Sequence, residues 1–422
     1  MRIALTTLGC KINQYETNLL CQDLRAKGNA IVPFDAEADV YVINTCSVTT
    51  KSDTQSRQTI RAAVKRAPGA KVIVTGCYAS IRPDEIRSLP GVHLVVPNAD
   101  KQAIPDQIME TATGSDQRSL DNGITARSTG GRTRSYLKIQ DGCDNRCSYC
   151  IVPSARGASR SASLADVLKE FDRLVQAAAP EIVLTGIHIG TYGSDREPQT
   201  SLSTLLPLLV QRRSRSRIRL SSIEANEITR EIIDLLGRGL CRHLHIPLQS
   251  GDDSVLALMK RQYTSGFYRD LLDRTAQEVP GIALGADVIV GFPGEGEREF
   301  QHTLDLVDQS PLTHLHVFTF SARPGTPAYD MKHQVPDHVR KKRNEELRNI
   351  GIRKNFEFRK RHLGSVLSVV IEDNNSDSGA FSGLTDNYIR VNVMGATRKH
   401  IGRECSVRIE EVKDAVTMAK LL

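Results

Sequence analysis

The sequence predicts an α/β protein in three parts: a parallel sheet at the N-terminus, a central partial barrel of six βα units, and a small β-barrel at the C-terminus. Three observations support this fold class. Short β-branched runs alternate with helical patterns over the first hundred residues. The alternation resumes further along at intervals of about thirty to forty residues, as barrels show. The last sixty residues hold short strands punctuated by glycine turns.

Length, charge and cysteine usage limit the class of protein. The 422 residues are enough for two or three domains, and the net charge of +7 is a modest excess of 56 basic over 49 acidic residues. The apolar run before Lys11 is too short for a secretory signal, and no apolar stretch approaches the length of a membrane span. Nine cysteines, an odd number, are then expected in a reducing compartment. We therefore expect a cytoplasmic protein with no membrane partner, whose cysteines serve metal or redox chemistry.

The N-terminal part, residues 1–112, is expected to form a parallel sheet. Its strand candidates are RIALTTLG (2–9), ADVYVINT (38–45), AKVIVTG (70–76) and HLVVPN (93–98). Cys10, Cys46 and Cys77 each follow one of the first three strands directly, so a parallel arrangement gathers them at the carboxyl edge, where open α/β sheets bind ligands. Cys21 lies among leucines in a helical stretch and is interpreted as a packing residue.

Residues 113–133 are polar and small, which is typical of a linker, and the central part then covers residues 134–335. Its strand candidates are SYLKIQDG (135–142), EIVLTGIHIG (181–190), RIRLSSIE (217–224), HLHIPLQSG (243–251), ALGADVIVGF (283–292) and HLHVFTFS (314–321). A barrel of this kind has its site at the carboxyl ends of the strands.

Residues 336–362 predict a basic helical connector, with ten Lys or Arg against four Asp or Glu. A second basic cluster at 212–219 supplies five arginines. Such clusters fit nucleic-acid binding but also an ordinary solvated helix face. Residues 363–422 hold seven basic and eight acidic residues on alternating strands, so any basic surface is expected mainly on the helix before them.

The segment DGCDNRCSYCIVP (141–153) places Cys143, Cys147 and Cys150 directly after the first barrel strand. Three thiolates could hold zinc with a fourth ligand from elsewhere, but no histidine or cysteine follows at zinc-finger spacing. On a 4Fe-4S cluster, three cysteines leave one iron open to a non-protein ligand, whereas electron-transfer clusters generally take four cysteines. An iron that is open to a non-protein ligand indicates that the cluster takes part in a reaction.

CDNRCSYC, with Tyr149 before its last cysteine, resembles the signature of the radical S-adenosylmethionine (SAM) superfamily. There the open iron binds the amino and carboxylate groups of SAM, and an electron from the cluster cleaves SAM to a 5′-deoxyadenosyl radical. The resemblance implies that Cys143, Cys147 and Cys150 hold the catalytic cluster and that Tyr149 belongs to the cofactor site.

Three N-terminal segments make the resemblance narrower. TLGCKINQYET (7–17), NTCSVT (44–49) and TGCYA (75–79) are similar to the N-terminal domain of the methylthiotransferases, which implies a second, auxiliary 4Fe-4S cluster on Cys10, Cys46 and Cys77. The same family is matched at TGIHIGTYG (185–193), SSIEANEI (221–228), HLHIPLQSGDDSVLALMKRQYT (243–264), DVIVGFPGE (287–295) and FSARPGTPA (320–328). The end of the chain resembles a TRAM domain, a small β-barrel associated with RNA binding. One departure is Gly296, which replaces a usual threonine and is expected to loosen a turn or helix start.

The opening GCKINQYET resembles the branch that modifies N6-threonylcarbamoyladenosine beside the tRNA anticodon. The resemblance implies that SAM is both the methyl donor to sulfur held at the auxiliary cluster and the radical source, and that a methylthio group is added at C2 of the adenine. The implied partners are the tRNA anticodon stem-loop, an electron donor such as flavodoxin or ferredoxin, and a sulfur source. Isopentenyladenosine tRNA or a ribosomal protein stays an alternative substrate, and a non-catalytic RNA-binding protein with structural metals is an alternative of another class.

Further site residues are expected in the barrel and on the basic helix. The expected SAM contacts are Gly186, Ser222, Glu224, Gln249 and Arg261. Arg261 could pair bidentately with the SAM carboxylate, or simply form a surface ion pair. His188, His243 and His245 are expected to be satisfied barrel histidines rather than ligands. The expected phosphate contacts are Arg340, Lys341, Lys342, Arg353 and Lys354.

Overall fold

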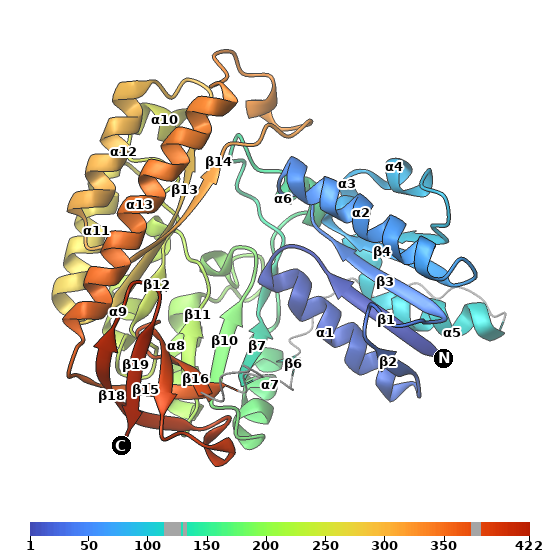
Figure 1. Ribbon diagram of the computed structural model, residues 1–422, viewed down its shortest axis with the longest axis horizontal. Helices are drawn as coiled ribbons and strands as arrows, with labels where there is room; N and C mark the ends of the chain where they lie inside the picture. The colour runs from blue at the N-terminus through green and yellow to red at the C-terminus, as the bar shows by residue number, and fades with distance from the viewer. Residues whose placement is uncertain (114–127, 130–132, 373–380) are drawn as a thin grey trace. The chain divides into compact units, whose positions relative to one another are not determined.

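The computed structural model, shown in Figure 1, describes residues 1–113, 128–129, 133–372 and 381–422. The chain divides into two compact units. The first unit comprises Met1–Thr129, Gln140–Ala162 and Ser321–Tyr329, and the second comprises Gly130–Ile139, Ser163–Phe320 and Asp330–Leu422. Most of the expected linker, residues 113–133, lies outside the described residues, and the expected domain boundaries stay a prediction.

A five-stranded parallel sheet forms the framework of the first unit. Its order is β2-β1-β3-β4-β5, where β1 is Arg2–Thr7, β2 is Ala30–Val32, β3 is Val40–Thr45, β4 is Lys71–Gly76 and β5 is Leu94–Val96. The parallel sheet predicted from the sequence is confirmed. The additional strand β2 is only three residues long, too short to give an alternating pattern.

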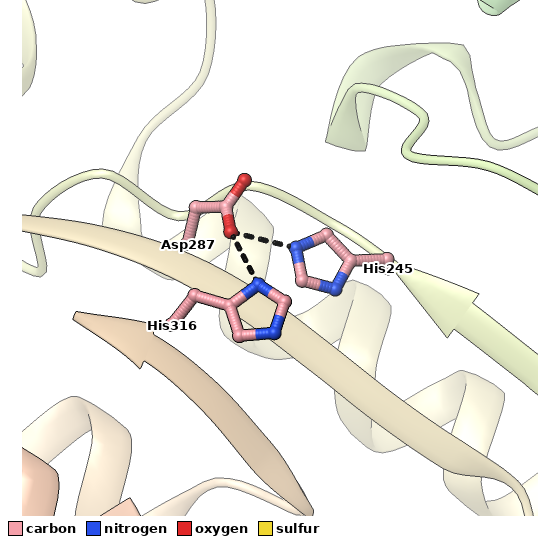
Figure 2. A group of neighbouring side chains, drawn as sticks. All are labelled: His245, Asp287 and His316. Atoms are coloured by element: carbon pink, nitrogen blue, oxygen red, sulfur yellow. Dashed lines mark hydrogen bonds and ion pairs between the residues drawn. The ribbon is translucent and has the colours of Figure 1, made fainter. Parts of the chain in front are cut away.

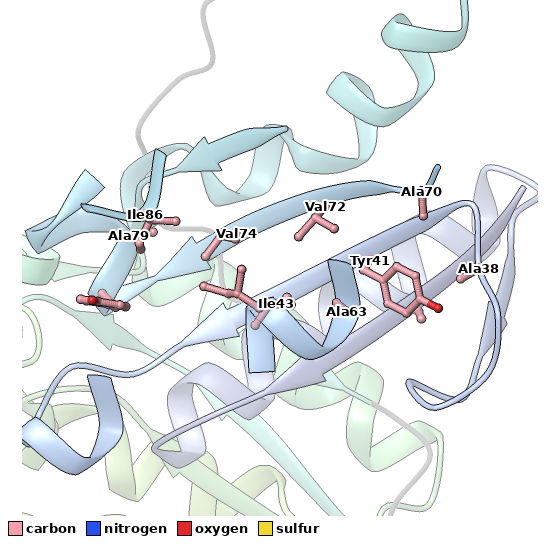
Figure 3. Close-up of a cluster of buried hydrophobic side chains, with 12 residues drawn as sticks. Ala38, Tyr41, Ile43, Ala63, Ala70, Val72, Val74, Ala79 and Ile86 are labelled. Carbon is pink, nitrogen blue, oxygen red and sulfur yellow. The ribbon is translucent and has the colours of Figure 1, made fainter. Parts of the chain in front are cut away.

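Helices cover both faces of this sheet. They are α1 (Lys11–Ala26), α2 (Thr50–Arg66), α3 (Cys77–Ile81), α4 (Pro83–Arg87), the 3-10 helix η1 (Asn98–Ala103) and α5 (Ile104–Thr113). Alternate residues of the central strand β3 point to opposite faces of the sheet, and all six are buried because helices cover both faces. Tyr41 and Ile43 pack under α2, as Figure 3 shows, while Val40 and Val42 pack with α1 and α5.

Short elements complete the first unit: β6 (Ser128–Thr129), the antiparallel pair β8 (Gln140–Asp141) and β9 (Arg160–Ser161), α6 (Val152–Arg156), and the 3-10 turn η4 (Pro327–Tyr329). Cys21 lies half-buried on α1 between the buried Leu20 and Leu24.

Six parallel strands form the framework of the second unit, as the sequence predicted. They are β7 (Arg134–Lys138), β10 (Glu181–Thr185), β11 (Arg217–Leu220), β12 (His243–His245), β13 (Ala283–Val290) and β14 (His314–Thr319). Strands β11, β10 and β7 pair side by side, as do β12, β13 and β14. The intervening helices are α7 (Leu164–Gln176), η2 (Ile189–Thr191), α8 (Leu202–Arg212), η3 (Ala225–Glu227), α9 (Arg230–Leu235), α10 (Asp253–Leu258), α11 (Ser265–Glu278) and α12 (Glu297–Gln309).

Side-chain caps fix several of these helix starts. Ser163, Ser201, Asp252 and Thr264 each accept a hydrogen bond from a backbone N–H in the first turn of α7, α8, α10 and α11, respectively. Gly296, the departure from the family pattern, lies directly before α12 and has no side chain for this role. The Glu299 carboxylate accepts from Gly296 N at 3.0 Å, so one half of the usual reciprocal cap remains.

The long helix α13 (Asp337–Arg361), orange in Figure 1, packs along the edge strand β14. Asn344 Nδ2 donates to Val317 O at 3.0 Å, and Arg340 Nη1 donates to Phe320 O at 2.7 Å. Polar side chains thus satisfy carbonyls on a strand edge that would otherwise lack partners. This role explains why α13 is so polar although it packs against a sheet.

A closed antiparallel and parallel barrel, red in Figure 1, ends the chain and confirms the predicted small β-barrel. Its order is β15-β16-β17-β19-β18, where β15 is Val366–Glu372, β16 is Phe381–Thr385, β17 is Arg390–Met394, β18 is Glu404–Val412 and β19 is Thr417–Leu421; η5 (Arg398–His400) lies between β17 and β18. Gly383 lies inside β16, where a Cβ would come within 2.6 Å of Val370 O, so close strand packing requires a glycine there.

A buried charged cluster joins this closed barrel to the parallel strands. Glu181 Oε2 pairs with Arg217 Nε at 2.6 Å, and Glu181 Oε1 pairs with Arg219 Nε at 2.9 Å. The two arginines also donate to the Leu384 and Thr385 carbonyls at 2.6 and 3.0 Å. Two of the five arginines at 212–219 are therefore packing residues, and this cluster is not a continuous basic surface.

Among the described residues, none of the helices combines the length and the apolarity needed to cross a bilayer.

Candidate metal centre

Cys10, Cys46 and Cys77 follow β1, β3 and β4, three adjacent strands of the parallel sheet, at their carboxyl ends. The chain approaches itself closely there: a Cβ on Gly9, whose φ is +95°, would lie 2.7 Å from Cys46 Sγ. Burial raises the pKa of the Cys46 thiol, and the nearby Cys77 and Cys10 thiols raise it further. The three thiols are thus within electrostatic reach of one another, and their role as cluster ligands stays a prediction.

This arrangement fits a group that is bound through sulfur. Three thiols at one edge supply sulfur ligands for an iron–sulfur cluster, and the missing side chain at Gly9 lets the Cys46 side chain lie directly against the backbone there. Cys10 is exposed whereas Cys46 and Cys77 are buried, so the group would be held at the surface of the unit with one side accessible.

A buried network of charges lies beside these thiols. Arg156 Nη1 pairs with Glu16 Oε1 at 2.8 Å and with Asp141 Oδ1 at 3.1 Å, and Lys101 Nζ pairs with Glu16 Oε2 at 2.5 Å. The side chain of Arg156 is only 1% exposed. Burial opposes its charge, but Glu16 and Asp141 outweigh burial and raise the pKa of Arg156. For Lys101 burial prevails and lowers the pKa.

Cys143, Cys147 and Cys150 lie in the segment between β8 and α6, within the same compact unit as the first three cysteines. Cys150 N donates to Cys147 O at 3.1 Å, and Cys143 N donates to the Gly157 carbonyl at 3.1 Å, so backbone bonds hold both ends of the segment. All three cysteines and Tyr149 are partly exposed. Partly exposed thiols on a fixed loop fit a cluster that keeps one iron accessible to another molecule.

The 321–329 loop contacts both cysteine segments. Arg323 Nη2 donates to Ser47 Oγ, next to Cys46, at 2.7 Å. The backbone N of Ala328 donates at 2.8 Å to the carbonyl of Ser148, next to Cys147. One loop therefore positions residues beside both groups of cysteines.

The residues expected to bind SAM lie in the second unit. Glu224 and Arg261 form a partly buried ion pair, and Arg261 Nε also donates to Tyr263 Oη at 3.2 Å. Burial raises the pKa of Glu224, and the opposing effect of Arg261 is too small to cancel this rise. The structure brings these two together, so Arg261 is not part of a simple surface pair. Their contacts with SAM stay a prediction.

Gln249, Gly186 and Ser222 lie at the ends of other strands. Gln249 has a φ of +65°, and its backbone bonds to Asp287 O at 2.8 Å and to Ile289 N at 2.9 Å. Its buried Oε1 has no hydrogen-bond partner among the described residues, which leaves an acceptor for a ligand or water. Gly186 follows β10 and is partly exposed, while Ser222 follows β11 and is exposed.

Two barrel histidines share one carboxylate, as Figure 2 shows. His245 Nε2 lies 2.9 Å and His316 Nδ1 lies 3.1 Å from Asp287 Oδ1, the three side chains coming from β12, β14 and β13. Burial would raise the pKa of Asp287, but hydrogen bonds from both histidines hold it well below its usual range. His188 similarly lies 2.6 Å from the Glu227 carboxylate. His188 and His245 thus each face a carboxylate, and whether they are ligands stays a prediction. His243 stacks on Tyr388 with ring centroids 4.0 Å apart.

The expected phosphate contacts on α13 differ in their surroundings. Lys341 and Lys342 are 75% and 76% exposed and lie within 4 Å of acidic groups one turn away. Arg353 pairs with Asp308 and Glu357 at the surface, and Arg340 donates to a carbonyl. Lys354 is buried, and its Nζ donates to Asp308 O at 2.8 Å and Ser310 O at 2.7 Å. Lys354 therefore closes the end of α12, and of these five residues only Lys341 and Lys342 have largely exposed side chains.

Sequence reasoning missed Arg156, Asn98 and Arg323. Arg156 lies six residues after Cys150, and Arg323 lies inside the segment FSARPGTPA, so both had a local signal. Their partners, however, are far along the chain: Arg156 bonds to Glu16, 140 residues away, and Arg323 bonds to Ser47, 276 residues away. A single sequence does not reveal such pairings.

Three family models match the chain: "Uncharacterized protein family UPF0004" over residues 2–97, "Radical SAM superfamily" over 137–307 and "TRAM domain" over 360–422. The curated relatives include "Threonylcarbamoyladenosine tRNA methylthiotransferase MtaB" of Bacillus subtilis, 40% identical over 96% of this chain and 93% of the relative. The protein of the same name from Aquifex aeolicus is 36% identical over 97% of this chain and 100% of the relative.

Relatives with other substrate names are less similar. A "tRNA-2-methylthio-N(6)-dimethylallyladenosine synthase" of Clostridium tetani is 28% identical over 96% of this chain and 93% of the relative. A "Ribosomal protein uS12 methylthiotransferase RimO" of Protochlamydia amoebophila is 29% identical over 98% and 91%. Among solved structures, the radical S-adenosylmethionine methyltransferase TsrM from Kitasatospora setae matches with a TM-score of 0.60 at 16% identity, covering 78% of this chain and 75% of that one. This likeness establishes the fold alone.

Proposed function

Because this chain belongs to the family of radical SAM methylthiotransferases named for threonylcarbamoyladenosine in tRNA, we propose that it adds a methylthio group to C2 of N6-threonylcarbamoyladenosine beside the anticodon. The chain is a transferase, and the non-catalytic alternative is not retained. One observation carries the proposal: a single compact unit holds both cysteine triads. The relatives of this chain are named for the same reaction on tRNA.

The radical SAM family uses a 4Fe-4S cluster with SAM, and Cys143, Cys147 and Cys150 would hold that cluster. We assign a second, auxiliary cluster to Cys10, Cys46 and Cys77, supported by their convergence at one sheet edge. When bound, the clusters and SAM supply a radical source and a place for the sulfur, chemistry that no acid or base of the protein provides.

The chain's own residues bind and orient. Arg156 and the 321–329 loop hold both cysteine segments, which keeps the two sets of ligands in a constant arrangement. The Glu224 carboxylate, fixed by Arg261, can accept hydrogen bonds from the SAM ammonium or ribose hydroxyls. The Gln249 Oε1 acceptor is a second group available for the cofactor.

The tRNA would be bound through its phosphates, with the adenine turned out of its stack for access to C2. Lys341 and Lys342 are suited to phosphates because both side chains are largely exposed on one turn of α13. The terminal TRAM domain would add RNA contacts. An electron donor such as flavodoxin or ferredoxin and a sulfur source complete the reaction, and the cytoplasm is the proposed location.

Analysis of the tRNA nucleosides from cells that lack this chain tests the proposed substrate. We expect their tRNA to retain N6-threonylcarbamoyladenosine and to lose its 2-methylthio derivative, which a wild-type copy restores and a Cys147→Ala copy does not. Unchanged methylthio-threonylcarbamoyladenosine, together with loss of the methylthio group from isopentenyladenosine or from a ribosomal protein, would assign the chain to an alternative substrate.

A further inference from the structure

Asn98, the first residue of η1, contacts Cys77 and the helix α6, which follows the second cysteine segment of the first unit. Its side-chain nitrogen Nδ2 lies 3.7 Å from Cys77 Sγ and donates at 2.9 Å to the carbonyl of Ala155 in α6. The first contact reaches an expected ligand of the auxiliary cluster. The second reaches the helix that follows Cys150.

The Ala155 carbonyl determines which way the Asn98 amide is turned. A carbonyl can only accept, so the group facing it must be the NH₂ rather than Oδ1. The second hydrogen of that NH₂ is then available to the Cys77 sulfur. The Asn98 Oδ1 is buried and has no hydrogen-bond partner among the described residues, so this amide is held by its donors alone.

Two buried cations reinforce the positive surroundings of Cys77. The Cys77 sulfur interacts electrostatically with both Lys101 and Arg156, whose side chains are 4% and 1% exposed. Because they are buried, solvent screens these interactions little. An N–H donor and two nearby cations all favour added negative charge at this sulfur.

We propose that Asn98 is a positioning residue for the auxiliary cluster: its amide donates an N–H···S hydrogen bond to the Cys77 thiolate and thereby raises the reduction potential of the cluster. The reduced cluster carries one more negative charge than the oxidised one, and hydrogen bonds to cluster sulfurs stabilise that charge. The same amide ties Cys77 to α6. This inference rests on the proposed function, since it takes Cys77 as a cluster ligand.

The test uses the full-length chain with Cys143, Cys147 and Cys150 changed to Ala, so that only the auxiliary cluster can form. Asn98→Ala removes the donor, and Asn98→Asp replaces it with a carboxylate of the same shape. Asn29→Ala is the matched control, because Asn29 Nδ2 donates to Leu24 O at 3.1 Å and lies 3.6 Å from a sulfur, that of Met109, which is no cluster ligand. Each protein is reconstituted with iron and sulfide, assayed for iron, and titrated with dithionite while the absorption and electron paramagnetic resonance spectra are recorded.

We expect both Asn98 variants to bind about four irons and to have a more negative midpoint potential, Asn98→Asp the more so. At the potential that half-reduces the parent, the reduced-to-oxidised ratio should fall about tenfold, which corresponds to about 59 mV for a one-electron couple. Asn29→Ala should titrate like the parent. Equal potentials in iron-loaded Asn98 variants and parent would overturn the role of Asn98 and leave the cluster assignment intact. A parent that binds no cluster would overturn the auxiliary site itself, and the inference with it.

Discussion

Arg156 Nη2 donates a 2.7 Å hydrogen bond to Oδ1 of Asn13. Asn13 follows Cys10 by three residues, and Arg156 follows Cys150 by six. The bond therefore joins two cysteine motifs from distant parts of the sequence within one compact unit. Because Arg156 also pairs with Glu16 and Asp141, this one buried side chain satisfies three partners.

Replacing Arg156 should destabilise the first unit strongly. In Arg156→Met the carboxylates of Glu16 and Asp141 lose a buried partner, which typically costs about 3–5 kcal/mol of unfolding free energy. Arg87→Met, at an exposed ion pair with Asp84, should cost less than about 1 kcal/mol. Urea unfolding of the apoprotein measures both, and equal midpoints for the two variants would show that the buried network contributes little.

The iron content should divide between the two triads. Wild-type protein should bind close to eight irons per chain after anaerobic reconstitution, and Cys46→Ala and Cys147→Ala should each lose about four. Only Cys46→Ala should still form 5′-deoxyadenosine from SAM, because its radical SAM cysteines are intact. The control is Cys21→Ala, within α1 and assigned to neither cluster, which should keep the full iron content. If Cys46→Ala lost all of its iron, the claim that the two triads bind their clusters independently would be contradicted.

The Glu181 cluster should make stability depend on pH in acid. Burial raises the pKa of Glu181, but Arg219 and Arg217 outweigh burial and lower it from 4.5 to about 2. A lowered native pKa contributes stability that is complete above pH 4.5 and is lost as the pH falls towards 2. The loss should be on the order of 3 kcal/mol, and Glu181→Gln should flatten the stability profile over this range. Parallel profiles for both apoproteins, measured by urea unfolding from pH 2 to 6, would count against this pair as the cause.

The exposed lysines of α13 should contribute to tRNA affinity through charge alone. The double variant Lys341→Ala, Lys342→Ala should weaken binding and reduce the slope of log affinity against log salt by about 1.4–1.8, if each lysine contacts one phosphate. Lys65→Ala, at an exposed position on α2, is the matched control and should change neither quantity. Filter binding at several salt concentrations measures this. A weaker complex with an unchanged slope would argue against phosphate contacts at these two positions.

The parts of the fold that the sequence predicted are those determined by local patterns. Runs such as VYVINT mark a buried strand by their β-branched residues, and a cysteine directly after such a run must lie at the strand's carboxyl end. Parallel pairing then brings Cys10, Cys46 and Cys77 to one edge without further information. Strand β2 was missed because three residues give no clear alternation.

The parts that could not be predicted depend on which distant side chains meet. A count of charges at 212–219 does not reveal that Glu181 neutralises Arg217 and Arg219 inside the protein. Likewise, Lys354 resembles its exposed neighbours in sequence but faces two carbonyls at the end of α12. Burial and pairing, which set the energy of a charge, follow from the tertiary structure.

The central claim is that this chain methylthiolates N6-threonylcarbamoyladenosine in tRNA, and the most direct measurement is made on purified components. The reconstituted enzyme, SAM and dithionite are incubated with threonylcarbamoylated tRNA, and the nucleosides are analysed by mass spectrometry. We predict a methylthio increment on that nucleoside, absent with Cys46→Ala and with Cys147→Ala. Formation of 5′-deoxyadenosine by fully iron-loaded enzyme, with methylthiolation of isopentenyladenosine tRNA but not of threonylcarbamoylated tRNA, would contradict the claim.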